Sequence, residues 1–240
     1  MLACAAPAAA QVQFVPRYDF HMSAEHLSHD DPRYVWDADF GGEIDVVDYG
    51  AGRFTFWANY EVITGEQLRV FDPNQGNYIL GGSLSGRIAG LEVAGVLYHQ
   101  SRHLSDRPKT DPVDWNMLGG RVLRTFTAGG SEWQARADLR RTIQHSYVDY
   151  SWELEPALTG RIPVGSHVAV TTTLSTRVMG TDGTRDRGTQ TGFLAEGGVR
   201  FEGSAGAIEL FVAAERRIDP YPMEFGTATW AKAGFRLVGR

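Results

Sequence analysis

A histidine and a serine two residues apart, His99 and Ser101, have the side-chain types needed for nucleophilic chemistry. They lie in a stretch, residues 91–103, whose alternating apolar and polar residues are typical of a β-strand. Side chains two residues apart on a strand share a face with their roots roughly 7 Å apart, so suitable rotamers allow a hydroxyl–imidazole hydrogen bond. Asn116 begins the next predicted strand and is placed to hold the far ring nitrogen of His99. A serine activated by a histidine that a third group orients is a general nucleophile arrangement.

The alternation predicts which way these side chains point. Leu91, Val93, Gly95 and Leu97 form the apolar face of the stretch, and His99, Ser101 and His103 continue that face. The opposite face holds Glu92, Tyr98, Gln100 and Arg102. We therefore expect the candidate site on an outward, lipid-facing surface, and the charges on an inward one.

The same period of two runs through the whole chain and is clearest in residues 151–162. There Trp152, Leu154 and Leu158 alternate with Glu153 and Glu155. Charges on one face and lipid-compatible side chains on the other are typical of a transmembrane β-barrel with a polar interior. We expect charges inside such a barrel to pair as a plug rather than to line a wide pore. The predicted strands cover residues 14–26, 40–49, 53–64, 78–88, 91–103, 116–127, 133–143, 151–162, 167–178, 191–201, 207–217 and 227–237.

The connectors between these strands alternate in length. Short Gly-rich ones, such as residues 89–90 and 128–130, alternate with longer polar ones at residues 28–33, 67–77, 104–115, 145–149, 181–187 and 219–225. Outer-membrane barrels have short periplasmic turns and longer external loops. The prediction is therefore an all-β fold: a transmembrane antiparallel up-and-down β-barrel of about 12 strands.

Composition limits the other classes of function and location. The net charge of -6 without a basic stripe argues against nucleic acid as a partner, and no apolar run approaches the ~20 residues of a membrane-spanning helix. The only cysteine, Cys4, lies in an Ala-rich start that resembles the end of a secretory signal peptide. We expect residues 1–11 to be a signal-peptide remnant and residues 12–240 a single barrel domain. Lipidation of Cys4 is a weaker alternative.

Aromatic residues gather near the predicted strand ends, as in the interfacial girdles of membrane barrels. The girdle predicted from the sequence consists of Tyr34, Trp36, Trp115, Tyr147, Tyr150, Trp152, Tyr221, Trp230 and Phe235. The alternative is that they are core aromatics of a soluble lipocalin-like or sandwich protein. In that case the face that carries Phe54, Phe56, Leu154 and Leu158 would be buried against other protein.

Around His99-Gln100-Ser101 the chain resembles outer-membrane phospholipase A, a family of twelve-stranded barrels from the outer membrane of Gram-negative bacteria. That family carries a His-x-Ser pair on one strand and an Asn on the next, on the lipid-facing side near the outer leaflet. The resemblance implies Ser101 as nucleophile, His99 as base and Asn116 as orienter, acting on acyl esters of outer-membrane lipids. It is close over about 30 residues; elsewhere only the architecture is alike.

The chain also departs from that family. Arg102-His103 stands where the family has Asn-Gly after its serine, and the loop to Asn116 is a few residues longer. The family dimerises in a calcium-dependent way, so the resemblance also implies calcium as a cofactor and a homodimer as an assembly. Asp106, Asp111 and Asp114 are the acidic candidates for a calcium site, although loop carboxylates are usually only solvated.

A second resemblance leads to a different interpretation. His99-x-Ser101-x-His103-Leu104-x-Asp106 is similar to a motif of an uncharacterised family of bacterial outer-membrane barrels. The protein would then be a non-catalytic structural barrel or a narrow solute channel, with the motif marking the end of a strand. A metal or proton-relay pair of His103 and Asp106, and a metal site among His21, His26 and His29, are further and weaker hypotheses.

Overall fold

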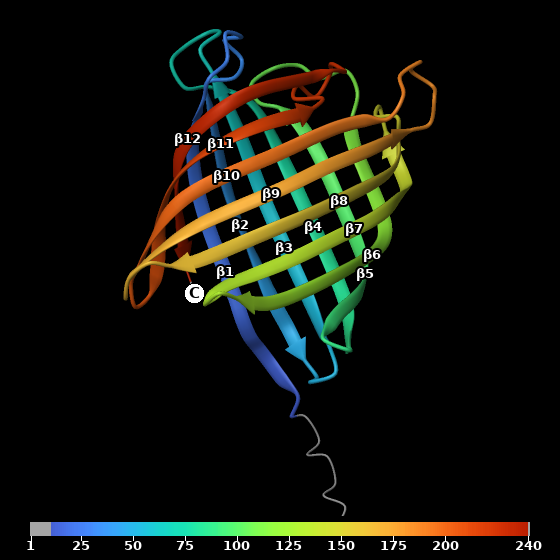
Figure 1. Ribbon diagram of the computed structural model, residues 1–240. Coiled ribbons are helices and arrows are strands. Elements are labelled where there is room, and N and C mark those ends of the chain that lie inside the picture. Colours follow the sequence, from blue (N-terminus) through green and yellow to red (C-terminus); the bar gives the residue numbers. More distant parts are fainter. Residues whose placement is uncertain (1–10, 240) are drawn as a thin grey trace, which may run out of the picture.

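The structure, a computed structural model that describes residues 11–239, is a closed barrel of twelve antiparallel strands (Figure 1). Each strand pairs with its sequence neighbours, and residues Phe20–Leu27 of the first strand pair with the last strand to close the ring. Within the described residues, no helix is long and apolar enough to cross a membrane. The predicted fold class is confirmed. The strands are β1 (Gln13–Leu27), β2 (Trp36–Asp48), β3 (Arg53–Gly65), β4 (Asp72–Ile88), β5 (Leu91–Leu104), β6 (Val113–Ala128), β7 (Ser131–Ser146), β8 (Tyr150–Pro163), β9 (Val168–Thr181), β10 (Gln190–Glu202), β11 (Gly206–Ile218) and β12 (Thr227–Gly239).

The connections alternate in length around the barrel as predicted, except that only residues 147–149 join β7 to β8. At one end, two to four residues join each pair of strands, and Gly90 and Gly130 there adopt a positive φ that suits a tight turn. The longer loops gather at the other end (Figure 1). Because the number of strands is even, β1 begins and β12 ends at the short-turn end. The signal-peptide prediction, including Cys4, lies almost entirely outside the described residues.

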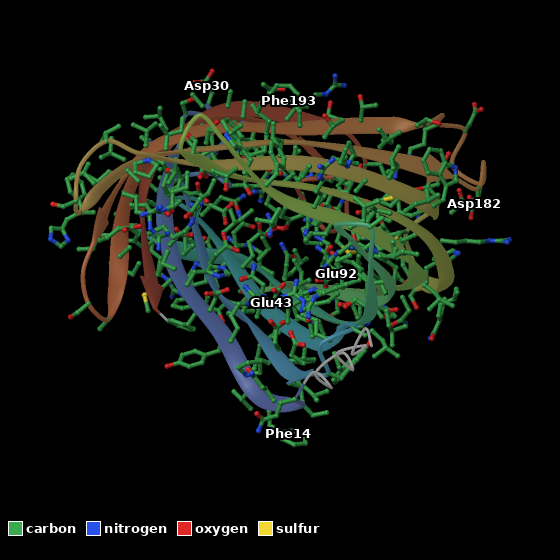
Figure 2. The ribbon with its side chains drawn as sticks, turned by 60° about the horizontal axis from the view of Figure 1, so that its bottom comes forward. Phe14, Asp30, Glu43, Glu92, Asp182 and Phe193 are labelled. Carbon is green, nitrogen blue, oxygen red and sulfur yellow. The ribbon has the colours of Figure 1, made fainter. Side chains whose placement is uncertain are left out.

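Side chains alternate between the two faces of the wall as the sequence predicts. On β7 and β8, Asp138 and Glu153 are fully buried inside, while Leu139 is 59 % exposed on the outside. Figure 2 shows Glu43 and Glu92 pointing into the ring. Phe54 and Phe56 are exposed on the outer wall, with no second sheet over them in the described chain. This arrangement excludes the soluble sandwich.

The predicted loop over residues 67–77 is wrong in its second half, because β4 begins at Asp72. The sequence Asp72-Pro-Asn-Gln-Gly-Asn77 has the composition of a turn. Gln75 and Asn77 are nevertheless buried inside the barrel, where other polar groups satisfy them. Asn74 is buried as well; its amide donates to the carbonyl oxygen of Arg33, while its Oδ1 has no hydrogen-bond partner among the described residues. Polar side chains are compatible with a strand here because the face they line is the polar lumen.

The predicted aromatic girdle is also partly wrong. Trp115, Tyr150, Tyr34 and Trp230 are almost completely buried within the barrel and its long-loop end, whereas Trp152 is partly exposed. Trp115 and Tyr150 contact each other edge to face inside the barrel. For Trp115 the reason is the two-residue period, since an outward Asn116 requires its neighbour to point inward. For Tyr150 it is a register shift between Tyr150 and Trp152, which turns Tyr150 to the inner face.

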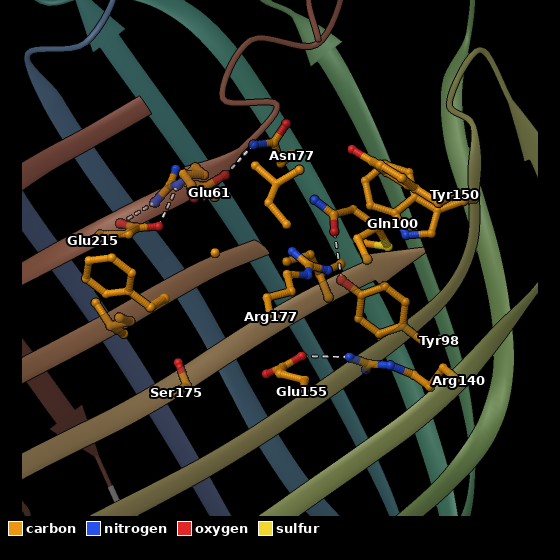
Figure 3. Close-up of a pocket in the computed structure, with 18 of the residues that line it drawn as sticks. Glu61, Asn77, Tyr98, Gln100, Arg140, Tyr150, Glu155, Ser175, Arg177 and Glu215 are labelled. Carbon is orange, nitrogen blue, oxygen red and sulfur yellow. Dashed lines mark hydrogen bonds and ion pairs between the residues drawn. The ribbon is translucent and has the colours of Figure 1, made fainter. Parts of the chain in front are cut away.

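Ion pairs and these aromatic side chains fill most of the lumen. Arg140 and Arg177 pair with the fully buried Glu153, and Arg121 pairs with the equally buried Asp138. A cavity of about 370 Å³ remains, lined by side chains such as Tyr98, Gln100 and Arg177 (Figure 3). The barrel therefore has a filled interior with one modest cavity, not a wide pore.

Candidate active site

Strands β5 and β6 place the candidate residues on the outer wall, near the long-loop end. Tyr98, Gln100 and Arg102 are buried inside the barrel. Leu97 is 55 % exposed, and His99 and Ser101, which share its parity, follow it on the outer wall. His99 and Ser101 therefore point outward, as the alternation of the sequence predicts.

The sheet register brings His99 and Asn116 directly opposite each other on neighbouring strands. His99 Nδ1 lies 2.9 Å from Asn116 Oδ1. A carbonyl oxygen only accepts hydrogen bonds, so the neutral imidazole of His99 has its proton on Nδ1 and a lone pair on Nε2. This is the tautomer that a general base requires.

A third side chain, Gln144 on β7, fixes the amide of Asn116. Asn116 Nδ2 donates to Gln144 Oε1 at 3.3 Å, so the Asn116 oxygen is turned toward His99. Sequence reasoning missed Gln144. On β7 it has the same parity as the inward residues Asp138 and Arg140, and should therefore point into the barrel.

A β-bulge at Ile143 explains the outward direction of Gln144. Asn116 pairs with Gln144 but Met117 pairs with Thr142, so Ile143 is left unpaired. One extra residue in a strand moves every later side chain to the opposite face. No signal in the β7 sequence marks this bulge.

Ser101 lies beside this hydrogen-bonded group without joining it. Within residues 11–239, no hydrogen bond links Ser101 Oγ to His99, whose Nδ1 contacts Asn116 instead. Across the sheet Ser101 faces Tyr78 on β4 and Asp114 on β6. Tyr78 also packs edge to face with His103, at 5.3 Å between ring centroids. A change of rotamer on this open face is needed to bring Ser101 Oγ to His99 Nε2.

Lys109, in the loop between β5 and β6, brings a positive charge close to Ser101. Its Nζ donates at 2.7 Å to the carbonyl oxygen of Arg102, the residue after Ser101. Partial burial lowers the pKa of the Lys109 ammonium, and Asp114 opposes this shift. Nothing local in the sequence shows that the loop folds back over the end of β5, so the position of this lysine could not be predicted.

The three acidic candidates for calcium do not form a cluster. Asp106 pairs with Arg69 at 2.9 Å, Asp111 accepts the hydroxyl of Thr110, and Asp114 lies on β6 opposite Ser101. In the described chain, the single group of three or more potential metal ligands close together is Glu25, Asp37 and Asp39, inside the barrel.

The residues of the two weaker metal hypotheses have other contacts, and the three histidines form no group of close ligand atoms within the described residues. His103 contacts Tyr78, while Asp106 contacts Arg69. His21 is half-buried and contacts Asn59, whereas His26 and His29 contact Trp36 and Tyr34.

Comparison with known proteins supports the architecture. The COG4313 outer membrane channel from Pseudomonas putida F1 has a TM-score of 0.56 and 11 % identity, over 98 % of this chain and 99 % of that chain. The Salmonella typhi outer membrane phospholipase dimer with bound calcium has a TM-score of 0.54 and 12 % identity, over 93 % of this chain and 90 % of that chain. LpxR from Salmonella typhimurium has a TM-score of 0.52 and 9 % identity, over 92 % of this chain and 99 % of that chain.

This protein is a β-barrel of the bacterial outer membrane. No family model matches the sequence, and no curated protein matches it. At such low identities the similar structures establish the fold alone. The barrel's outer wall carries exposed apolar side chains such as Leu97, Leu139 and Leu174, as expected of a surface that faces lipid.

Proposed function

We propose that the protein hydrolyses acyl esters of outer-membrane lipids, with Ser101 as nucleophile, His99 as base and Asn116 as orienter. The observation that carries the proposal is the contact of 2.9 Å between His99 Nδ1 and Asn116 Oδ1 on the lipid-facing wall. A histidine held in this tautomer can act as a general base. Ser101 lies two residues later on the same face of β5. The similar fold of outer membrane phospholipases is compatible with this activity.

The chemistry follows from the side chains that are present. His99 Nε2 takes the proton of Ser101 Oγ while Oγ attacks the acyl carbonyl carbon. When the ester bond breaks, the alcohol leaves with that proton and the acyl group stays on Ser101. A water molecule, deprotonated by His99, then releases the fatty acid. The Nδ1 contact with Asn116 keeps the imidazole correctly protonated through both steps.

The location of the site determines which substrates reach it. An acyl ester in the outer leaflet approaches the wall from the bilayer, so a catalytic group on the outer face needs no pore. Lys109 Nζ is held at the carbonyl oxygen of Arg102, next to Ser101 in the chain, and a positive charge at this end of β5 would favour an anionic substrate. Phospholipid and lipid A acyl esters both meet these requirements.

The test is hydrolysis of phospholipid and of lipid A by detergent-refolded protein, with and without calcium. Ser101→Ala and His99→Ala should each abolish activity, and the double variant should be no worse, because the two residues act as a unit. Asn116→Ala should lower kcat about 10- to 100-fold, since the imidazole loses its fixed tautomer.

Matched controls are available on the same strand and the loop after it. His103→Ala removes an outward histidine that contacts Tyr78 and should keep activity. Ser105→Ala removes a loop serine and should also keep it. Folding is checked by the shift in gel mobility on heating. A folded wild-type barrel without activity on either lipid, or an active Ser101→Ala, would reject the proposal.

A narrow solute channel is the second candidate function. The cavity of about 370 Å³ inside the barrel favours it, since that space would suit a small solute. The paired charges around the cavity argue for low conductance. Single-channel recording in planar bilayers separates the two functions, because a hydrolase with a filled lumen should show no stable open level.

A further inference from the structure

A group of carboxylates lies together on the inner wall where β1, β2 and β3 meet. Glu25 on β1 lies directly opposite Asp37 on β2, and Asp39 on β2 lies directly opposite Glu61 on β3. Like charges at directly opposed positions of a sheet repel each other. Two such pairs side by side need a compensating positive charge.

The cations next to these carboxylates are too few. Arg217 pairs with Asp37, Glu61 and Glu215, and Lys232 pairs with Glu25 and Glu215. Glu61 and Glu215 lie side by side in the lumen (Figure 3). No other cation in residues 11–239 forms an ion pair with any of the five carboxylates. With all five carboxylates ionised, two bases would leave an excess of three negative charges in a largely buried place.

A buried oxygen within this group accepts no hydrogen bond. Asp37 is 1 % exposed; Arg217 holds its Oδ2 at 2.7 Å, but its Oδ1 has no partner among the described residues. Asp39 has only the amide of Asn59, which donates to its Oδ1 at 2.6 Å. An unsatisfied buried carboxylate oxygen is costly, and a bound cation would satisfy it.

We propose that Glu25, Asp37 and Asp39 form a site for a hard divalent cation, of the calcium class, inside the barrel. Each offers one oxygen, and these three oxygens lie within 4.8 Å of one another. Calcium–oxygen distances of about 2.3–2.6 Å place two ligands of one ion at most about 5 Å apart, so the three oxygens can share one ion. Asp39 is half-buried and leaves the ion open to water ligands from the lumen. Calcium accepts such a mixed set of carboxylates and water.

The site is distinct from the lipid-facing residues His99 and Ser101, and it does not depend on their activity. Its ligands come from β1 and β2, next to the seam where β1 meets β12. A cation there would cancel repulsion between the strands at the seam. Its expected effect is therefore on the stability of the barrel.

The test uses the full chain, refolded in detergent and freed of metal with a chelator. Titration with calcium chloride, followed by calorimetry, should show saturable binding, with weaker binding of magnesium. The thermal unfolding midpoint should rise with calcium concentration, because a ligand of the folded state stabilises that state. A wild-type barrel with neither binding nor a shift overturns the proposal, and would mean that protons neutralise the carboxylates.

Amide variants locate the site. Asp37→Asn and Asp39→Asn keep the side-chain shape and should weaken calcium binding about tenfold or more. In chelator Asp39→Asn should fold at least as well as the wild type, because it removes a repelling charge, whereas Asp37→Asn also loses the ion pair with Arg217. Asp39→Asn breaks no ion pair, so it serves if Asp37→Asn fails to fold. Asp138→Asn, another buried lumen carboxylate, and Asp114→Asn, on the outer wall, should bind calcium as the wild type does. Unchanged binding in Asp39→Asn, or its loss in Asp114→Asn, overturns the assignment.

Discussion

Replacing Leu174 by arginine tests whether the outer wall faces lipid. Leu174 is 50 % exposed on the outer wall and is the seventh of the fourteen residues of β9. With a rise of about 3.4 Å per residue and a strand tilt of about 40°, it lies within about 2 Å of the strand's midpoint along the membrane normal. An arginine on the lipid face at the bilayer midplane costs about 2–4 kcal/mol. Leu174→Arg should lower the free energy of unfolding by that amount.

Two further arginine substitutions serve as controls for position and direction. Thr173→Arg changes the neighbouring inward residue, where the new guanidinium would lie opposite Glu196, and should cost less than about 1 kcal/mol. Phe201→Arg places the charge on the outer wall, one residue from the short-turn end of β10, and should cost about 0–1 kcal/mol.

The assay is reversible guanidinium unfolding of each variant in lipid vesicles, followed by tryptophan fluorescence. Leu174→Arg should lower the free energy of unfolding much more than Thr173→Arg or Phe201→Arg does. Equal costs at Leu174 and Thr173 would refute the lipid-facing assignment of this wall. A larger cost at Phe201 than at Leu174 would refute the assumed depth of the strands.

Three further predictions concern other parts of the molecule. Glu153→Gln removes a fully buried carboxylate from its two arginine partners and should lower the free energy of unfolding by about 3–5 kcal/mol. Glu132→Gln removes a carboxylate from an exposed ion pair and should change that free energy by less than about 1 kcal/mol. Gln144→Leu should lower kcat for lipid hydrolysis with little change in KM, because it frees the Asn116 amide to rotate. An unchanged kcat and pH profile would show that Gln144 does not position Asn116. The side-chain hydrogen bond from Arg33 lowers the pKa of Asp31 from its ordinary value of 3.8, so Asp31 stabilises the loop above that pH and ceases to do so as the pH falls through the lowered value. Hydrogen exchange in residues 28–35 should therefore be faster in Asp31→Asn than in the wild type at pH 7, and this difference should disappear as the pH falls through the lowered pKa of Asp31.

The sequence by itself determined the strand pattern, the closed all-β class and the faces of most side chains. This was possible because the information is local: a period of two in hydrophobicity states which residues share a face. His99, Ser101 and Asn116 could be placed on the outer wall for the same reason. Loop composition misled the interpretation where a polar lumen replaced solvent, as at Gln75 and Asn77.

Only the tertiary structure decided which strands lie at which register, and with it which side chains meet. Gln144 reaches Asn116 because a bulge at Ile143 turns it outward, and such a bulge depends on the pairing of two whole strands. The crowding of Glu25, Asp37 and Asp39 likewise arises from the pairing of β1 with β2. Hydrophobic alternation specifies the faces of a strand, but contacts across a sheet depend on register and ring closure, which are long-range properties.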